Sequence, residues 1–367
     1  MQTRIQLLPA VLLVFALPLA AIAKPRWEID SASLPPGFDR AKAEEMLRAS
    51  DATVERYNQE EERALAAQSK RLEQAMAPFR QKMRRAIDGD PNLQAELSRL
   101  ESQFRSGRAV PTAKEIADFR RRVFAKAGID EKKMQNAARS ALSGQVRTRG
   151  NAAAEIELTP EGAMVITEPP IQEPPPGVSS RGVFKTVSLQ APFPARQLEQ
   201  NVGGKQKIDQ AAGSYEGRAS VNDSRGTNRA GLAHFQTIPR GTRRVRVTAQ
   251  LPNTPYKAKI GVNGSFFADA YARARSYIRV YNGSGTLLCM TRKTHTSVSA
   301  GWFLFTSVQR SGEDSIVLDC TFDAPPSGTD IVIRFTADNY VREGGINYLS
   351  VAEVIGKPRN IRIEFIN

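Results

Sequence analysis

The sequence predicts an α+β protein with two domains, an N-terminal α-helical hairpin or bundle and a C-terminal antiparallel β-sandwich of jelly-roll-like form. Three observations lead to this prediction. Residues 39–147 are rich in Ala, Glu, Gln, Arg and Lys, and their apolar residues recur every three or four positions. A proline-rich stretch follows at 148–180. From residue 181 onward apolar and polar residues alternate in short runs between turn residues, which is typical of half-buried strands.

The first 23 residues of the 367-residue chain have the three parts of a secretory signal peptide. Arg4 supplies the positive start, Leu7 to Ala20 form an apolar core, and Ala21 to Ala23 match the A-x-A cleavage pattern. The alternative is an uncleaved membrane anchor, but the apolar core is short and contains Pro9 and Pro18. No later apolar run is long enough to cross a bilayer. We therefore expect a periplasmic or secreted protein whose mature chain begins with an extended segment at 24–38.

Residues 39–147 predict four helices joined by short turns. The first runs to Ile87, with a kink or a break at Pro78. Asp90 marks the start of the second helix, and Thr112 with Glu115 forms a capping box before the third. Short turns between amphipathic helices imply antiparallel neighbours. This helical domain is also a candidate for self-association through a coiled coil.

The stretch 148–180 predicts a semi-rigid linker, because its proline run from Glu168 to Gly177 favours extended polyproline geometry. The chain carries a net charge of +14, and the excess is spread over both halves. A diffuse positive field suits a cell envelope with anionic polymers, and simple solubility explains it equally well. The same diffuse field also suits nucleic acid, which is the less favoured partner, and the chain has no basic tail.

The second half, 181–367, predicts a β-sandwich of about ten strands. Many of the runs alternate cleanly, as in 243–251, where every second residue is apolar. The predicted strands are 183–189, 230–238, 243–251, 270–281, 286–291, 302–308, 316–322, 331–337, 346–354 and 361–366.

The most distinctive strand has two unlike faces. One face of 268–280 carries mainly alanines with Ile278 and Val280, and the other carries tyrosines and arginines. We call this second set the Tyr/Arg ladder: Tyr271, Arg273, Arg275, Tyr277, Arg279 and Tyr281. We expect it to face outward. Tyrosine stacks on sugar rings and arginine binds carboxylate, sulfate or phosphate, so the ladder is a candidate ligand surface for an acidic glycan. Single-stranded nucleic acid is an alternative ligand. The other alternative is that the ladder binds no ligand, because a loop or the helical domain covers this face.

Cys289 and Cys320 are the only cysteines of the chain. An even number in an exported chain predicts one disulfide, and two buried free thiols are the alternative. Both lie in predicted strands that would be too far apart to bond in a plain meander. A bridge therefore requires the chain to cross between the two sheets.

The order of motifs in the second half resembles the galactose-binding-like family of carbohydrate-binding jelly rolls. It runs from Phe235-Gln-Thr-Ile-Pro through RVRVTAQLPN and ARARSYIRVY to Ile346-Asn347-Tyr348-Leu349-Ser350-Val351. The closing strand of that family often reads I-D-N-V-x-V, and Asn347 replaces its aspartate. The resemblance implies non-catalytic carbohydrate binding, and the replacement puts the family's structural calcium site in doubt.

We find no catalytic set and expect no cofactor. His234 and His295 lie far apart in sequence and lack metal-ligand spacing. A serine nucleophile with His295 as its base stays open, but no motif selects it. The carboxylates that could form a glycosidase pair are Asp319, Asp323, Asp338 and Glu343. Two oxygen-rich pairs, Asn222-Asp223 and Asp338-Asn339, remain candidate sites for a structural calcium ion.

These observations predict an exported, non-catalytic binding or scaffold protein of the cell envelope, whose sandwich contacts a glycan or a protein surface. One alternative is a glycan-active hydrolase or esterase with its site at one end of the sandwich. A second alternative is a periplasmic subunit of a larger secretion or surface assembly. No transmembrane segment is expected after signal cleavage.

Overall fold

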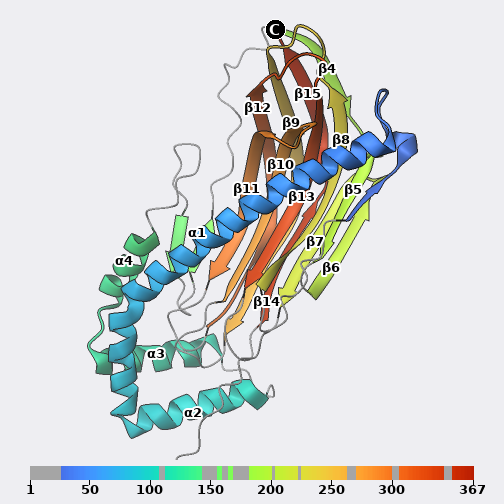
Figure 1. Ribbon diagram of the computed structural model, residues 1–367. Coiled ribbons are helices and arrows are strands. Elements are labelled where there is room, and N and C mark those ends of the chain that lie inside the picture. Colours follow the sequence, from blue (N-terminus) through green and yellow to red (C-terminus); the bar gives the residue numbers. More distant parts are fainter. Residues whose placement is uncertain are drawn as a thin grey trace, which may run out of the picture.

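The structure is a computed structural model that describes residues 26–106, 112–142, 155–158, 164–167, 182–200, 203–221, 225–262, 270–299, 306–342 and 349–367. Helices near the N-terminus are followed by two antiparallel sheets that pack as a sandwich (Figure 1). The predicted α+β class is therefore confirmed. The predicted signal peptide lies outside the described residues. None of the described helices is long and apolar enough to cross a membrane.

Sheet A has eight strands. In spatial order they are β1 (Arg26–Ile29), β5 (Ala195–Gln200), β8 (Arg225–Thr237), β13 (Asp330–Arg342), β10 (Tyr271–Asn282), β11 (Leu287–Ser299), β3 (Met164–Thr167) and β2 (Glu155–Leu158). Sheet B is built on the long strand β9 (Arg244–Val262), which pairs with β12 (Thr306–Asp323) along one edge. The other strands of sheet B are β4 (Val183–Leu189), β15 (Arg359–Ile366), β14 (Leu349–Gly356), β7 (Ser214–Val221) and β6 (Gly203–Asp209).

The core of the sandwich lies between the two sheets and uses the alternation seen in the sequence. Val245 and Val247 of β9 and Ile278 of β10 have no exposed surface and belong to one apolar cluster. The predicted strand cores are recovered, but several strands are longer than expected. The described part of the predicted run 302–308, from Thr306 onward, and the run 316–322 belong to one strand, β12, which crosses a bulge between Asp314 and Ile316 instead of turning.

Six of the described strands lie where no strand was expected: β1, β2, β3, β5, β6 and β7. β1 lies in the segment 24–38 and pairs with β5, and β2 and β3 lie in the proposed linker 148–180 and extend sheet A beyond β11. Val165 of β3 is only 3% exposed, which shows that this part of the proposed linker packs on the sandwich. The remainder of the proline-rich run lies outside the described residues.

The first helix, α1 (Arg40–Asp88), joins the sandwich to the helical part. Its first half lies diagonally across the outer face of sheet A (Figure 1). Ala43, Met46, Leu47 and Val54 pack there in one cluster with residues of β5, β8, β10 and β13. The helix is continuous through Pro78, so no break occurs there, and it bends in its second half (Figure 1).

The second half of α1 packs with α2 (Pro91–Ser106), α3 (Ala113–Ala127) and α4 (Glu131–Leu142) in a separate apolar cluster. Met76 and Met83 of α1 are fully buried in it. The Thr112–Glu115 capping box is present at the start of α3. The helical part therefore has a core of its own, and α1 is its connection to the sheet.

A disulfide between Cys289 of β11 and Cys320 of β12 joins sheet A to sheet B, with a Cα–Cα distance of 5.8 Å. The two strands follow one another in sequence but belong to different sheets. This is the crossover that the sequence required for a bridge. The predicted disulfide is therefore confirmed.

Candidate functional site

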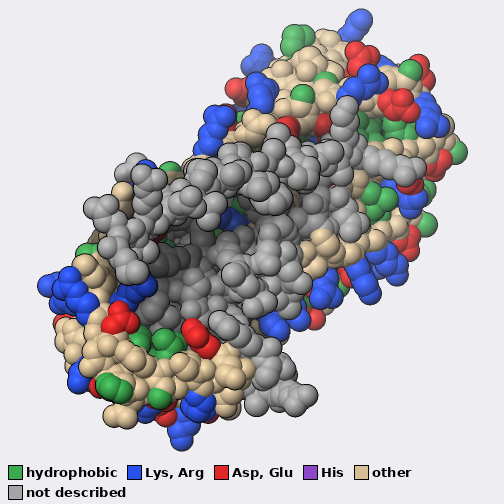
Figure 2. Space-filling model, turned by 60° about the horizontal axis from the view of Figure 1, so that its bottom comes forward, with side chains coloured by type: hydrophobic (Ala, Val, Ile, Leu, Met, Phe, Trp, Pro, Cys, Tyr) green, Lys and Arg blue, Asp and Glu red, His purple; other side chains and the backbone are tan. Residues whose placement is uncertain are grey.

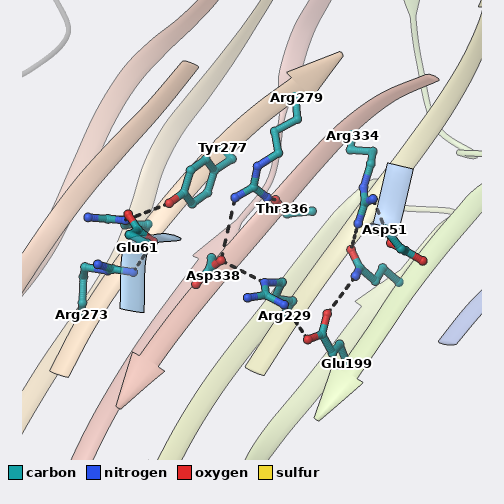
Figure 3. Close-up of polar contacts among 12 residues, drawn as sticks. Asp51, Glu61, Glu199, Arg229, Arg273, Tyr277, Arg279, Arg334, Thr336 and Asp338 are labelled. Atoms are coloured by element: carbon teal, nitrogen blue, oxygen red, sulfur yellow. Dashed lines mark hydrogen bonds and ion pairs between the residues drawn. The ribbon is translucent and has the colours of Figure 1, made fainter. Parts of the chain in front are cut away.

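The Tyr/Arg ladder lies on the outer face of β10, but α1 covers it. Tyr281 has no exposed surface, and Tyr277, Arg273, Arg279 and Arg275 are 2%, 3%, 4% and 7% exposed. Only Tyr271, at the start of the strand, is half-buried. The expectation of an outward ladder open to solvent is wrong, because the apolar side of the first half of α1 packs on this face of the sheet. The ladder instead belongs to a network of buried charges under the helix (Figure 3).

At one end of the network Arg334 of β13 meets the N-terminal part of α1. Its Nη1 donates to Ser50 Oγ and Asp51 Oδ1, both at 2.9 Å, and its Nη2 donates to Gln197 Oε1 at 2.8 Å. The Trp27 indole donates to Asp51 Oδ2 at 2.9 Å, and its ring lies 4.7 Å from the Arg334 guanidinium. Burial raises the pKa of Asp51, and the charge of Arg334 opposes that rise only in part.

The centre of the network is Arg229 of β8, which pairs with two buried carboxylates. It contacts Glu199 of β5, and its Nε donates to Asp338 Oδ2 at 3.0 Å. Gln197 connects this group to Arg334, because its Nε2 donates to Glu199 at 3.2 Å. Burial raises the pKa of Asp338, but the nearby arginines lower it further, so that it lies below its usual range.

The network continues from Asp338 to the ladder. Arg279 Nη2 lies 3.9 Å from Asp338 Oδ2, and the Arg279 guanidinium lies 3.8 Å from the centre of the Tyr277 ring. Arg275 donates to the Tyr277 hydroxyl at 2.9 Å and also pairs with Glu61 of α1. The contacts thus form a continuous chain from Asp51 to Glu61, two residues of the same helix (Figure 3).

Glu61 is the contact between the middle of α1 and the sheet. Its carboxylate accepts from Arg273 Nη2 at 2.9 Å and from Arg292 Nη1 at 3.1 Å, and it also pairs with Arg275. Burial acts to raise the pKa of Glu61, but the arginines lower it well below its usual range. Three guanidinium groups therefore share one carboxylate at this end of the network.

The sequence reading missed the network partners of the ladder. Asp51 and Glu61 lie in a helix that was expected to belong to a different domain. Arg334 was treated as an ordinary strand residue, and Asp338 was considered only as a catalytic carboxylate or a calcium ligand. One signal was present: the outward positions of β13 read Arg334, Thr336, Asp338 and Tyr340, which is an unusually polar face for a central strand. Such a face needs either solvent or charged partners.

A second group of residues has the hydrogen-bond order of a serine hydrolase. His295 Nε2 lies 2.8 Å from Ser276 Oγ, and His295 Nδ1 lies 2.7 Å from Asp314 Oδ2. The pairing of β10 with β11 shifts its register between Ala274 and Arg275, opposite His295. The pairing of β12 with β9 shifts its register next to Asp314. The structure thus brings His295 next to a serine, as one alternative required.

Solvent reaches this group at the Asp314 carboxylate, whereas a serine hydrolase needs access at the serine hydroxyl. Ser276 has no exposed surface and lies on the face of β10 that points between the sheets, whereas Asp314 is 26% exposed. A nucleophilic serine must meet its substrate, so the exposed end should carry the hydroxyl. The group also lies in the middle of β10 and not at one end of the sandwich.

The other residues considered for chemistry lie apart from one another. Asp319 pairs with Arg246, the Asp323 side chain is 91% exposed, and Asp338 is buried with Arg229. Asn339 donates to the Gly217 carbonyl at 2.7 Å, and among the described residues no group of three His, Cys, Asp or Glu side chains could hold a metal ion. Asn222, Asp223 and Glu343 lie outside the described residues. Burial lowers the pKa of His234 to about 4.

No family model matches the chain, and no curated protein is similar to it. Several solved structures, including the following three, show a weak likeness. One is the enzymatically active domain of tailspike protein 4 of bacteriophage CBA120, with 9% identity, a TM-score of 0.18, and coverage of 42% of this chain and 20% of that chain. An arabinose-bound α-L-arabinofuranosidase has 14% identity, a TM-score of 0.11, and coverage of 55% and 23%.

The third is a structure of infectious bursal disease virus, with 9% identity, a TM-score of 0.14, and coverage of 56% and 52%. In each comparison the chain spans less than two thirds of the length of the other protein. At these TM-scores the likeness supports neither a shared detailed fold nor a shared activity.

Proposed function

We propose that the mature chain is an exported, non-catalytic scaffold of the cell envelope, which joins a binding β-sandwich to a helical arm. The observation that carries this proposal is the burial of the Tyr/Arg ladder under α1. The ladder and its partners attach the helix to the sheet, so the polar face of sheet A serves the assembly of the protein itself. With 49 residues, α1 is about 70 Å long, which is enough to hold the helical part away from the sandwich.

The surface charge supports an envelope polymer as the partner of this scaffold. Lys and Arg side chains are spread over the described parts of the face in Figure 2, with Asp and Glu among them. With a net charge of +14, such a surface attracts anionic polymers over a broad area. The resemblance to galactose-binding-like jelly rolls supports a glycan as that polymer, and a protein surface in the envelope is the other partner that fits.

The test uses the full chain, expressed with its signal peptide in a bacterial host. We expect the mature protein to begin at Lys24, to contain the disulfide, and to sediment with purified cell-wall sacculi that carry anionic polymers. Sacculi stripped of these polymers are the control, and soluble sugar released over hours is measured in parallel. Absence of sedimentation, or continuous release of sugar, would argue against a non-catalytic envelope scaffold.

The second candidate is a hydrolase, which the hydrogen-bond order of Ser276, His295 and Asp314 favours. A fluorophosphonate probe labels an activated serine covalently, so the native protein is incubated with the probe and compared with Ser276→Ala. Labelling that Ser276→Ala abolishes would support the hydrolase. We expect none, because Ser276 is buried between the sheets.

A further inference from the structure

The Glu61 cluster, which we define as Glu61, Arg273, Arg275 and Arg292, carries more positive than negative charge. All three arginines contact the one carboxylate. Arg334 and Arg229 each have at least one carboxylate partner. Arg334 pairs with Asp51, and Arg229 pairs with two carboxylates, Glu199 and Asp338. Buried guanidinium groups are costly to leave without a counter-ion. The excess positive charge therefore favours the binding of a second anionic group at this end.

Hydrogen-bond donors that lack a partner lie in the same place. Among the residues that the structure describes, Arg273 donates through Nη2, and its buried Nε and Nη1 have no hydrogen-bond partner. Most buried donors are paired, so two unpaired donors on one charged side chain need an explanation. The rings of Tyr271 and Tyr340 lie 5.9 Å and 5.5 Å from its guanidinium. Aromatic rings beside a free guanidinium edge are a common arrangement for holding an acidic sugar.

The middle of α1 is held to the sheet weakly. Between Val54 and Leu72 none of the side chains that the structure describes is buried, and the two apolar clusters of α1 lie on either side of this stretch. Within it, Glu61 makes the ion pairs with the sheet. One side of the cluster reaches solvent, since the Arg292 and Glu61 side chains are 39% and 27% exposed, whereas Arg273 and Arg275 are buried. An anion can therefore reach the cluster and compete with Glu61.

We infer that the Glu61 cluster is a binding site for the carboxylate or sulfate group of an acidic glycan, and that Glu61 occupies the place of that group in the structure. The incoming anion pairs with Arg292 first, then takes the bonds of Arg273 and Arg275, and the middle of α1 moves away. Tyr271, which is half-buried at the edge of the cluster, stacks on the sugar ring. This inference rests on the proposed glycan-binding function and names its ligand class.

The test compares Glu61→Gln with Glu62→Gln, which changes the net charge by the same amount at an exposed neighbouring position. Binding is measured to polygalacturonate, dextran sulfate, neutral dextran and an oligothymidylate. We expect Glu61→Gln to bind the two acidic glycans about tenfold more tightly than Glu62→Gln, because the competing carboxylate is gone. Neutral dextran should show no gain, and adding Arg273→Met to Glu61→Gln should remove it. Circular dichroism confirms that the variants are folded.

A measurement on the unaltered protein keeps the inference testable if Glu61→Gln does not fold. Hydrogen exchange at residues 56–71 should become faster with polygalacturonate than with dextran, because the glycan displaces Glu61. Equal affinities of Glu61→Gln and Glu62→Gln, or unchanged exchange, would overturn the inference. A larger gain for oligothymidylate than for either glycan would replace the glycan by nucleic acid. Sedimentation of the unaltered protein with sacculi would continue in these cases, so the proposed function is judged separately.

Discussion

Replacing Asp51 by asparagine tests whether the buried network holds α1 on the sheet. The substitution keeps the shape of the side chain but removes its charge. Asp51 Oδ1 lies 2.9 Å from Arg334 Nη1, and Arg334 has no exposed surface. In Asp51→Asn the guanidinium has neutral acceptors only, which are the new amide oxygen, Ser50 and Gln197. Removing one partner of a buried ion pair costs about 3–5 kcal/mol. Since Asp51 is 15% exposed and its own burial is unfavourable, we expect the lower end, about 3 kcal/mol.

The assay is equilibrium unfolding in urea at pH 7, followed by far-ultraviolet circular dichroism. The matched control is Glu44→Gln in the same helix, which breaks the ion pair of Glu44 with Arg40 across 2.8 Å. Both side chains of that pair are largely exposed, so the control should cost no more than about 0.5 kcal/mol. A loss in Asp51→Asn within 1 kcal/mol of the control would refute the idea that this network fastens the helix.

Three further predictions concern other parts of the molecule. The pKa of Glu61 is lowered, so the ionised Glu61 stabilises the folded protein above the ordinary glutamate pKa of about 4.3, and this stabilisation is lost as the pH falls below that value. The urea midpoint of Glu61→Gln should therefore fall less between pH 6 and pH 3 than the urea midpoint of the unaltered protein. Reduction of the Cys289–Cys320 disulfide, whose ends are 31 residues apart, should lower the free energy of unfolding by about 3–4 kcal/mol in calorimetry with and without dithiothreitol. Gly231→Ala should cost about 1–3 kcal/mol by the same calorimetry, because its Cβ would lie 2.5 Å from Thr336 Cγ2.

The strands of the sandwich could be predicted because burial on one face leaves a period of two. Val245 and Val247 are buried as expected, and so are Ala272 and Ala274 of β10. Strand ends were less predictable. Thr306–Asp323 forms one strand because its middle pairs with an equally long β9, and that partner is not visible in the local sequence.

What covers a strand face could not be predicted from the same pattern. Alternation on β10 separates two faces correctly, but a polar face is compatible with solvent and with charged partners alike. The contact between Glu61 and Arg273 joins residues 212 positions apart, and no local signal links them. The apolar residues Met46 and Leu47 did mark a helix face in need of a partner. Reading that face together with the outward face of β13 would have suggested their pairing.

The distribution of contacts along α1 suggests why the network uses charges. An apolar stripe holds a helix on a sheet but tolerates sliding, and a buried ion pair adds little stability over well-packed apolar side chains. Ion pairs do require one register, because each carboxylate must meet its own guanidinium. We therefore expect the double substitution Asp51→Leu with Arg334→Met to be more stable than Asp51→Asn but to dock less uniquely. Distances between spin labels at exposed Glu45 of α1 and Arg362 of β15 should then spread over a wider range. An unchanged, narrow distribution would mean that the apolar contacts of α1 alone set its position.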